Sequence, residues 1–350
     1  MNAGLLFAGV VGQAHGVARL VDAATSPVHA YLLAGPPGSG KTQAARAFAA
    51  ALLCPDGGDG TCRDCRLALA GAHPDVREVE RAGPFITMDQ ARDITTLASR
   101  TPVEGRRKVL ILHEFHLLRD EAAAALLKTI EEPPASTVFV ILADDVPPEL
   151  VTIASRCLRV DFRPVPHDLV VETLVAEGVD TDAAILVADA AAGDLDRARL
   201  LAADPGLAAR RAAFHRLPTR LDGTGAAVAA ATDELLGLID GAAQPLRHRH
   251  AAEAEELERR AAQFGERRGD RKEVEERHKR ELRRHRTDEL KSGLVALAAS
   301  YRDRLADGTL PDAGGGVTAV RAVHEAIESL ERNPNERLLL ESLLLRLPPV

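Results

Sequence analysis

Long apolar runs are missing from this sequence of 350 residues. The longest, VFVILA from Val138 to Ala143, is far shorter than the roughly 20 residues that a membrane-spanning helix needs. The N-terminal stretch MNAGLLFAGVVGQ has neither a basic flank nor a long apolar core, so we do not expect a signal peptide. These absences predict a protein of the cytoplasm with no membrane contact.

An excess of positive charge is missing as well. The 44 Lys and Arg are outnumbered by 52 Asp and Glu, which gives a formal net charge of −8. Binding along the nucleic-acid backbone depends on clustered basic side chains that release counterions. The charge balance therefore argues against a surface that coats DNA, and we expect any nucleic-acid contact to be local or indirect.

Cysteine is scarce, since the chain has only four. Three of them gather at Cys54, Cys62 and Cys65. In a chain of this size such a group is more typical of metal chemistry than of a disulfide framework.

The first half of the chain alternates short apolar runs with longer helical patterns. This alternation is typical of a parallel sheet with crossover helices, so we predict the α/β fold class. A helix is expected over Asp120–Glu131, because Pro133 and Pro134 would stop it. The expected strands are nearly continuous apolar runs, as in a sheet covered on both faces; they are residues 30–34, 76–79, 109–112, 138–143 and 158–162.

Strand patterns disappear after residue 166, and the remainder is predicted to be helical. We expect an α/β domain over residues 1–163, a small helical unit over 164–207 and a larger helical unit over 208–350. Within the last, residues 247–291 are dense in charges of both signs. We interpret this segment as long, solvent-exposed helices. A basic arm that binds nucleic acid is the alternative, against which the mixed signs and the scarcity of aromatic residues argue.

The segment GPPGSGKT matches the phosphate-loop pattern G-x-x-x-x-G-K-[ST] at every required position. An apolar run precedes it and a helical pattern follows, an order that directs backbone N–H groups and a helix dipole at phosphate. Lys41 would meet the β- and γ-phosphate oxygens of ATP or ADP, and Thr42 would ligate Mg²⁺. A glycine turn without a ligand is the alternative. The predicted nucleotide-binding residues are Gly35, Pro36, Pro37, Gly38, Ser39, Gly40, Lys41 and Thr42.

Residues 122–157, AAAALLKTIEEPPASTVFVILADDVPPELVTIASRC, carry a more specific pattern. They strongly resemble the bacterial replicative clamp-loader ATPases, the AAA+ subunits that open the sliding clamp of the DNA polymerase III holoenzyme. LLKTIEEPP and SRC are close to signatures of that family. The segments VGQAHGVARLVDAATSPVHAYLLAGPPGSGKT, AHPDV and ERNPNERLLLESLLLRL are similar to it too. The resemblance covers most of the chain and is weakest over residues 247–291.

The resemblance implies a RecA-like AAA+ nucleotide domain, a helical lid and a helical collar through which five subunits form a ring. The implied partners are gamma/tau and delta subunits in a hetero-pentamer and, through this assembly, the sliding clamp and primer-template DNA. Any polymerase activity would belong to the holoenzyme, because nothing here resembles a polymerase active site. The family contains gamma/tau motors, which hydrolyse ATP, and a more rigid delta-prime subunit, which donates an arginine to its neighbour's ATP.

The stretch VLILHEFHLL, residues 109–118, departs from the motor pattern. Motor subunits end this strand in Asp-Glu, with the Asp holding the magnesium shell and the Glu orienting the attacking water. Here the pair is His113 and Glu114. An imidazole is a poor ligand for magnesium, and Glu114 would point to the opposite side of an extended strand. We expect nucleotide binding with weak or absent hydrolysis; a histidine that only forms a hydrogen bond at the strand end is the open alternative.

Two arginines are candidates for contacts with nucleotide. The resemblance implies that Arg156, in SRC, acts in trans on a neighbour's γ-phosphate, a contact that can be worth about 10³–10⁵ in rate. Without the resemblance, Arg156 would be interpreted as structural. Arg197, in GDLDRAR, is a candidate second contact, although the register could place Asp196 there, and a solvated helix charge is a further alternative.

The loop CPDGGDGTCRDC, residues 54–65, resembles a zinc module. The family shows four cysteines, the last three spaced C-x-x-C-x-x-C, and Asp59 stands here where one of them would be. We expect Zn²⁺ on Cys54, Asp59, Cys62 and Cys65, with water or His73 as alternatives for the fourth ligand. Three reduced cysteines without metal are the other interpretation.

Together these features favour the arginine-donating kind of clamp-loader subunit over a gamma/tau-like motor with active ATPase. A P-loop nucleotide kinase is a distant alternative, because LLKTIEEPP and SRC have no place in one.

Overall fold

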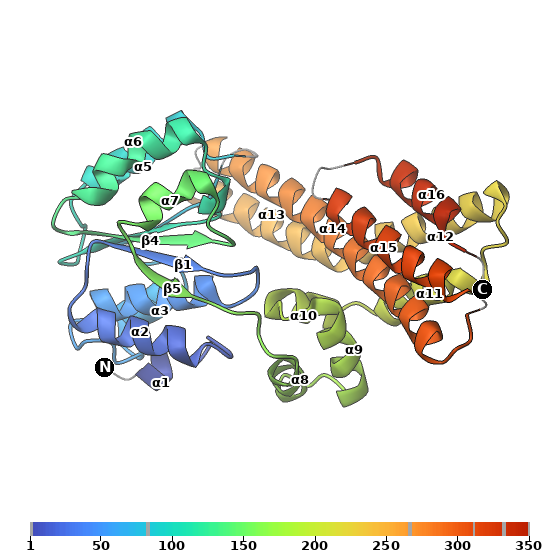
Figure 1. Cartoon of the computed structure of the whole chain (residues 1–350). Coiled ribbons are helices and arrows are strands. Elements are labelled where there is room, and N and C mark those ends of the chain that lie inside the picture. Colours follow the sequence, from blue (N-terminus) through green and yellow to red (C-terminus); the bar gives the residue numbers. More distant parts are fainter. Residues whose placement is uncertain (1–2, 82–84, 265–267, 311, 331–333, 349–350) are drawn as a thin grey trace. The chain divides into compact units, whose positions relative to one another are not determined.

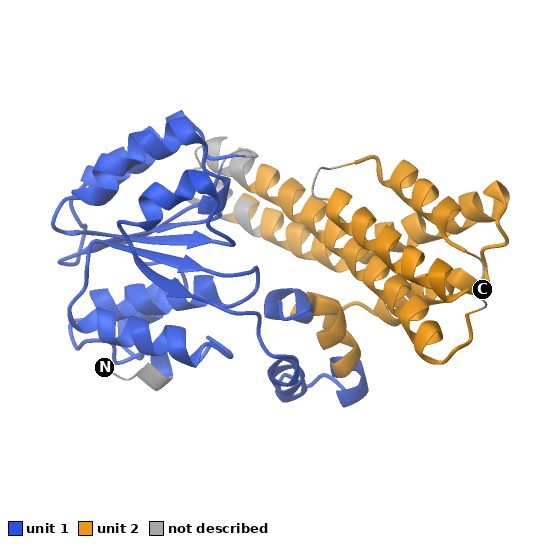
Figure 2. Ribbon diagram, in the orientation of Figure 1, with its two compact units in different colours: residues 1–184, 192–198 blue, residues 185–191, 199–350 orange. Residues whose placement is uncertain are grey.

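Two compact units make up the chain in the computed structural model, which describes residues 3–81, 85–264, 268–310, 312–330 and 334–348. Unit 1 comprises residues 1–184 and 192–198, and unit 2 comprises residues 185–191 and 199–350 (Figure 2). The helices expected to form a small unit over residues 164–207 are therefore divided between the two.

A five-stranded sheet, parallel throughout, lies within unit 1 (Figure 1). The strand order is β2-β3-β4-β1-β5. All five predicted strands are present within one residue of their expected bounds, which confirms the predicted α/β class. The strands are β1 Ala30–Ala34, β2 Val76–Val79, β3 Lys108–Leu112, β4 Thr137–Ala143 and β5 Leu158–Asp161.

Helices cover both faces of this sheet (Figure 1). Successive residues of β1 alternate between two cores: Tyr31 and Leu33 belong to the one that contains Phe48, whereas Leu32 belongs to the one that contains Ile94. Burial on both faces is why the strands are continuous apolar runs. The helices up to β5 are α1 Ala3–Leu6, α2 Ala14–Thr25, α3 Lys41–Leu53, α4 Arg63–Leu69, α5 Met88–Ser99, η1 Phe115–Leu117, α6 Asp120–Glu131 and α7 Pro148–Ala154.

The register of the sheet brings two strand ends to the same level. Ala34, the last residue of β1, pairs with Ala143, the last residue of β4. β3 ends earlier, because Leu112 pairs with Ile141 of β4. The residues that follow β1 and β4 are therefore neighbours at the carboxyl edge, and the residue that follows β3 is set back from them.

The chain after β5 is helical in all the residues that the structure describes there, as predicted. Phe214 and Tyr301 are among the largest buried side chains of unit 2 and belong to one apolar core. The helices are α8 His167–Ala176, α9 Thr181–Ala191, α10 Leu195–Ala202, α11 Leu207–Arg216, η2 Leu217–Thr219, α12 Gly225–Ala242, α13 Gln244–Phe264, α14 Arg268–Ala306, α15 Ala313–Ser329 and α16 Glu336–Arg346.

A buried ionic triad fixes α11 against α14 in unit 2. Arg210 Nη2 lies 2.5 Å from Asp204 Oδ2 and 2.7 Å from Glu289 Oε2, and all three side chains are at most 7% exposed. Burial alone would lower the pKa of Arg210, but the two carboxylates raise it above its usual value. Arg210 is therefore held in its charged form inside the unit.

A symmetric set of ion pairs joins α13 to α14, which lie side by side (Figure 1). The pattern R-H-x-x-E occurs once in each helix. His250 Nε2 lies 2.7 Å from Glu281 Oε2, and His278 Nε2 lies 2.8 Å from Glu253 Oε2. The arginine before each histidine bonds to the same glutamate, and the two imidazole rings stack with centroids 3.8 Å apart. Each helix thus binds the glutamate of the other.

The charge-dense segment 247–291 is helical wherever the structure describes it. Residues 265–267 and the side chains of 256, 257 and 260–273 lie outside the described part of the chain. Among the helices that the structure describes, none combines the length and the apolar character needed to cross a membrane.

Candidate nucleotide and metal sites

The phosphate loop, residues 35–42, joins β1 to α3. Gly38 and Gly40 adopt φ angles of 62° and 86°, in the left-handed region that glycine reaches without strain. Gly40 precedes α3, and its carbonyl accepts the N–H of Ala44. The buried Ser39 hydroxyl donates to the carbonyl of Pro36 at 2.7 Å. The first N–H groups of α3, which have no partner within a helix, are the groups that a phosphate would bind.

Lys41 is only 8% exposed, and its amine is engaged at the edge of the sheet. Its Nζ donates to the carbonyl oxygen of Gly35, to that of Pro36 at 2.7 Å and to Asp144 Oδ1 at 3.1 Å. Asp144 directly follows β4. The loop lysine therefore has a carboxylate partner that the sequence analysis missed.

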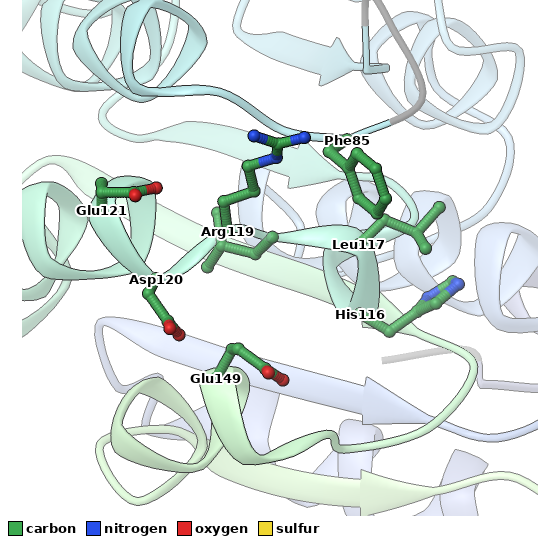
Figure 3. A pocket seen from close by; sticks show the side chains of 8 residues that line it. Phe85, His116, Leu117, Arg119, Asp120, Glu121 and Glu149 are labelled. Carbon is green, nitrogen blue, oxygen red and sulfur yellow. The ribbon is translucent and has the colours of Figure 1, made fainter.

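His116, in η1, extends this network into a pocket (Figure 3). Its Nδ1 accepts the backbone N–H of Asp144 at 3.1 Å, and its Nε2 lies 3.8 Å from Asp144 Oδ2. On another wall, the guanidinium of Arg119 lies 4.7 Å from the centre of the Phe85 ring, a cation–π contact. The pocket has a volume of about 380 Å³ and is lined by Phe85, His116, Leu117, Leu118, Arg119, Asp120, Glu121 and Glu149.

His113 directly follows β3, as predicted, and its side chain bonds to a residue of β2. Its Nε2 lies 2.9 Å from Glu78 Oε2. Arg46 of α3 binds the same carboxylate through Nε at 2.6 Å and Nη2 at 3.1 Å. Burial alone would raise the pKa of Glu78, but the hydrogen bonds from His113 and Arg46 lower it to about 2. His113 thus belongs to a half-buried ionic cluster between β2, the end of β3 and α3.

Glu114 is a second residue whose partner the sequence analysis missed. Its φ of 49° is in the left-handed region, which is uncommon for a residue other than glycine. Its carboxylate accepts bonds from Arg81 Nε at 2.7 Å and Nη2 at 3.3 Å. Arg81 is therefore the partner of Glu114, which stands where motor subunits have the glutamate that orients water.

The start of α10 lies against the phosphate loop within unit 1. A Cβ added to Gly38 would come within 1.7 Å of Asp194 Oδ1, so a larger residue does not fit there. The same Asp194 oxygen accepts the N–H of Arg197 at 2.8 Å. Asp196 Oδ1 lies 3.4 Å from Gln43 Nε2 in the first turn of α3. Asp196, which the sequence analysis weighed beside Arg197 as a second contact with nucleotide, therefore bonds to α3, the helix that follows the phosphate loop.

Arg156 follows α7 and keeps 37% of its side chain exposed. Its Nε donates to Glu131 Oε1, and its Nη1 donates to the carbonyl of Thr152 at 2.7 Å and to Ser155 Oγ at 3.2 Å. Glu131 is the last residue of α6 and belongs to LLKTIEEPP. The two signature segments, LLKTIEEPP and SRC, therefore meet at one exposed ion pair.

The four predicted zinc ligands converge at the start of α4. One ligand atom from each of Cys54, Asp59, Cys62 and Cys65 lies within 4.8 Å of all the others. The Sγ atoms of Cys54 and Cys62 are 3.7 Å apart, close to the edge of about 3.8 Å that a tetrahedral site with Zn–S bonds of about 2.3 Å requires. The N–H groups of Cys62 and Thr61 donate to Asp59 and lower the pKa of its carboxyl. This donor set fits a zinc ion.

His73, the alternative fourth ligand, belongs to a different group, with Asp64 and Glu104. Its Nδ1 accepts the N–H of Asp75 at 3.0 Å, and its Nε2 lies 3.7 Å from Asp64 Oδ1. Cys157 also lies apart: its thiol donates to the carbonyl of Ile153, and burial raises its pKa to about 12.

Comparisons with known proteins are consistent with these features. Residues 17–166 match the family model described as "DNA polymerase III, delta subunit". The chain is 42% identical over 137 residues to the DNA polymerase III subunit delta' of Pseudomonas aeruginosa, covering 37% of this chain and 42% of that protein. It is 37% identical over 171 residues to the DNA polymerase III subunit tau of Bacillus subtilis, covering 47% and 30%.

The chain spans less than half the length of these two relatives. Among solved structures, a gamma subunit-related protein from Thermotoga maritima aligns over 95% of this chain and 97% of its own, with 19% identity and a TM-score of 0.44. The resemblance to DNA polymerase III clamp-loader subunits drawn from the sequence is confirmed.

Proposed function

We propose that this chain is a delta-prime-like subunit of a bacterial clamp loader that donates Arg156 in trans to the ATP of a neighbouring subunit. The observation that carries the proposal is the place of Arg156, 37% exposed at the surface where SRC meets LLKTIEEPP. A guanidinium held in this way can turn to a phosphate of another chain, because its bond to Glu131 is an exposed ion pair that costs little to break. Its partners would be gamma/tau and delta subunits and, through them, the sliding clamp and primed DNA in the cytoplasm.

The chain's own phosphate loop would bind ATP or ADP with Mg²⁺ and hydrolyse it slowly or not at all. Gly38, Gly40 and Lys41 supply a loop of the right form, and Thr42 would ligate the metal. His113 bonds to Glu78, and Glu114 bonds to Arg81. Neither residue at the end of β3 is therefore poised for its role in a motor subunit.

A gamma/tau-like motor is the second candidate, and one comparison favours it: the similarity to a tau subunit spans a longer segment than the similarity to a delta' subunit. The purified chain separates the two candidates. A delta-prime-like chain shows slow or undetectable ATP turnover by itself. Turnover at a motor-like rate that is lost in His113→Ala would contradict the delta-prime proposal.

The reconstituted loader tests Arg156. We expect Arg156→Ala to leave assembly unchanged and to slow hydrolysis at the neighbouring site by about 10³-fold or more, measured as single-turnover ATP cleavage. Arg159→Ala is the matched control, because Arg159 is a 52% exposed arginine of β5 that pairs with Asp161 within its own strand. If the Arg156→Ala loader cleaves ATP like the wild type, Arg156 does not act in trans.

We also propose that Cys54, Asp59, Cys62 and Cys65 bind zinc in a structural role. Cys54 lies at the end of α3, and Cys65 lies in the first turn of α4. A metal bound by all four groups would tie these two helices together. Four protein ligands leave no position for a reactive water, which distinguishes a structural site from a catalytic one.

A further inference from the structure

We propose that Asp144 is the carboxylate that holds magnesium in this phosphate site, in place of the strand-end Asp that His113 replaces. The assignment rests on the proposed nucleotide binding and extends it to a residue that comes from a different strand. The observation behind it is the 3.1 Å contact of Asp144 Oδ1 with the Nζ of Lys41.

The strand register explains why a residue after β4 can take this role. β4 pairs directly with β1, and Ala143 lies level with Ala34. The N–H of Gly35 donates to the carbonyl of Ala143 at 3.1 Å, so the first residue of the phosphate loop is bonded to the residue before Asp144. β3 is one strand farther away, and its end is set back by two residues. Asp144 is thus closer in topology to the phosphate loop than His113.

The side chains at the two strand ends support the same assignment. His113 Nε2 contacts Glu78 of β2, whereas Asp144 contacts the lysine of the phosphate loop. Asp144 is also 30% exposed, so water and a hydrated ion can reach it. It has the carboxylate oxygens that magnesium prefers, which the imidazole of His113 lacks.

Lys41 would exchange partners when nucleotide binds. Its amine now contacts Asp144 and the carbonyls of Gly35 and Pro36, and a bound triphosphate would draw it to the β- and γ-oxygens. That movement would release the carboxylate of Asp144, and Asp144 would then hold the metal together with Thr42, the residue that follows Lys41. Magnesium usually keeps several waters and takes one or two protein oxygens, so Asp144 and Thr42 are a sufficient protein set.

His116 would act as a positioning residue for Asp144. It accepts the backbone N–H of Asp144 through Nδ1 at 3.1 Å, which leaves the proton of the neutral ring on Nε2, 3.8 Å from Asp144 Oδ2. One ring therefore contacts both the backbone and the carboxylate of Asp144 and restrains its orientation, as groups behind a metal ligand commonly do.

The test measures ATP binding by the whole chain with excess Mg²⁺ and with EDTA, by titration calorimetry. We expect the wild type to bind ATP more tightly with Mg²⁺ than with EDTA, and we call this ratio of affinities the magnesium gain. In Asp144→Asn the magnesium gain should be about 10- to 100-fold smaller. Affinity for ATP in EDTA should be equal or higher in the variant, because Lys41 loses a competing partner. Asp145→Asn is the control, since it removes an equal charge from the exposed neighbouring residue. His113→Ala should also keep the magnesium gain.

Binding of Mn²⁺ to the ATP complex, followed by electron paramagnetic resonance, gives a second readout, and Asp144→Ala gives a second variant if the amide proves unstable. A magnesium gain that survives both Asp144 substitutions overturns this assignment and leaves the nucleotide site standing. A gain that disappears in His113→Ala overturns it too. Failure of the wild type to bind ATP under either condition overturns the proposed nucleotide site itself, and with it this assignment.

Discussion

The ionic cluster of Glu78, His113 and Arg46 makes a quantitative prediction about acid stability. Glu78 is 18% exposed and accepts bonds from both partners. Burial opposes its charged form, but the two partners lower its pKa from the usual 4.5 to about 2. A carboxylate whose pKa is lower in the folded chain stabilises the fold above its unfolded pKa, and this stabilisation is lost as the pH falls through the folded pKa.

The size of the effect follows from that difference. At about 1.4 kcal/mol for each pH unit, the interval from 4.5 to about 2 corresponds to about 3 kcal/mol. Glu78→Gln keeps the shape of the side chain and removes its charge, so it should lower the free energy of unfolding by about this amount at pH 6. The difference between the variant and the wild type should shrink as the pH falls toward 2, because Glu78 of the wild type then takes up a proton as well.

The assay is urea unfolding of the whole chain, followed by circular dichroism, at a series of pH values from 7 down to 2.5. Glu80→Gln is the control, because Glu80 is exposed and follows the same strand. His113→Ala should show part of the same loss, since it removes one of the two donors. A stability difference between wild type and Glu78→Gln that is the same at pH 6 and pH 3 would refute the reasoning, and His113 would then be free for a role in the nucleotide site.

Two further predictions concern the zinc ligands and the helical hairpin. The chain purified without chelator should contain about one zinc ion. Asp59→Asn keeps an acceptor for the turn at Thr61 and Cys62, and it should bind zinc at least tenfold more weakly in a competition assay with a chromogenic chelator. Unchanged affinity would show that Asp59 only caps the turn. In the hairpin, burial lowers the pKa of His250, while Glu253 and Glu281 have lowered pKa values because the bonds from the opposite helix outweigh their burial. For all three groups the unfolded chain takes up protons first, so the stability of this pair of helices should fall as the pH drops below about 6.5 and again below about 4.5. The measurement is the protection of the α13 and α14 amides against hydrogen exchange, corrected for the intrinsic exchange rate at each pH, and this protection should fall in the same two steps. His250→Gln should abolish the first step, and its persistence in that variant would contradict the prediction.

Local patterns in the sequence were enough to predict the strands and the phosphate loop. Strands that are buried on both faces must be apolar at every position, so β1, β3 and β4 stand out as continuous runs. The loop needs glycine at Gly38 and Gly40, where φ is positive, and this requirement makes the loop recognisable in the sequence as well. The cysteine group was found for a similar reason, because its ligands lie within twelve residues of one another.

The partners of the site residues could not be predicted in this way. Asp144 stands directly after a predicted strand, which was a usable signal, but only the strand order shows that β4 lies beside β1. Glu78 and Arg81 lie more than 30 residues from His113 and Glu114, the side chains after β3 that they bind. The ion pairs between α13 and α14 depend on how the two helices align. The repeated R-H-x-x-E pattern alone does not predict them, because each histidine binds the glutamate of the other helix.

The sequence by itself determined which elements form and which kind of chemistry the phosphate loop, SRC and the cysteines can carry, because each depends on residues that are neighbours along the chain. Tertiary structure decided which carboxylate each cation meets. Lys41 pairs with Asp144 and His113 pairs with Glu78 because parallel strands place residues at one edge by their order in the sheet, whatever their separation in sequence. That ordering moves the candidate magnesium ligand from the end of β3 to the end of β4.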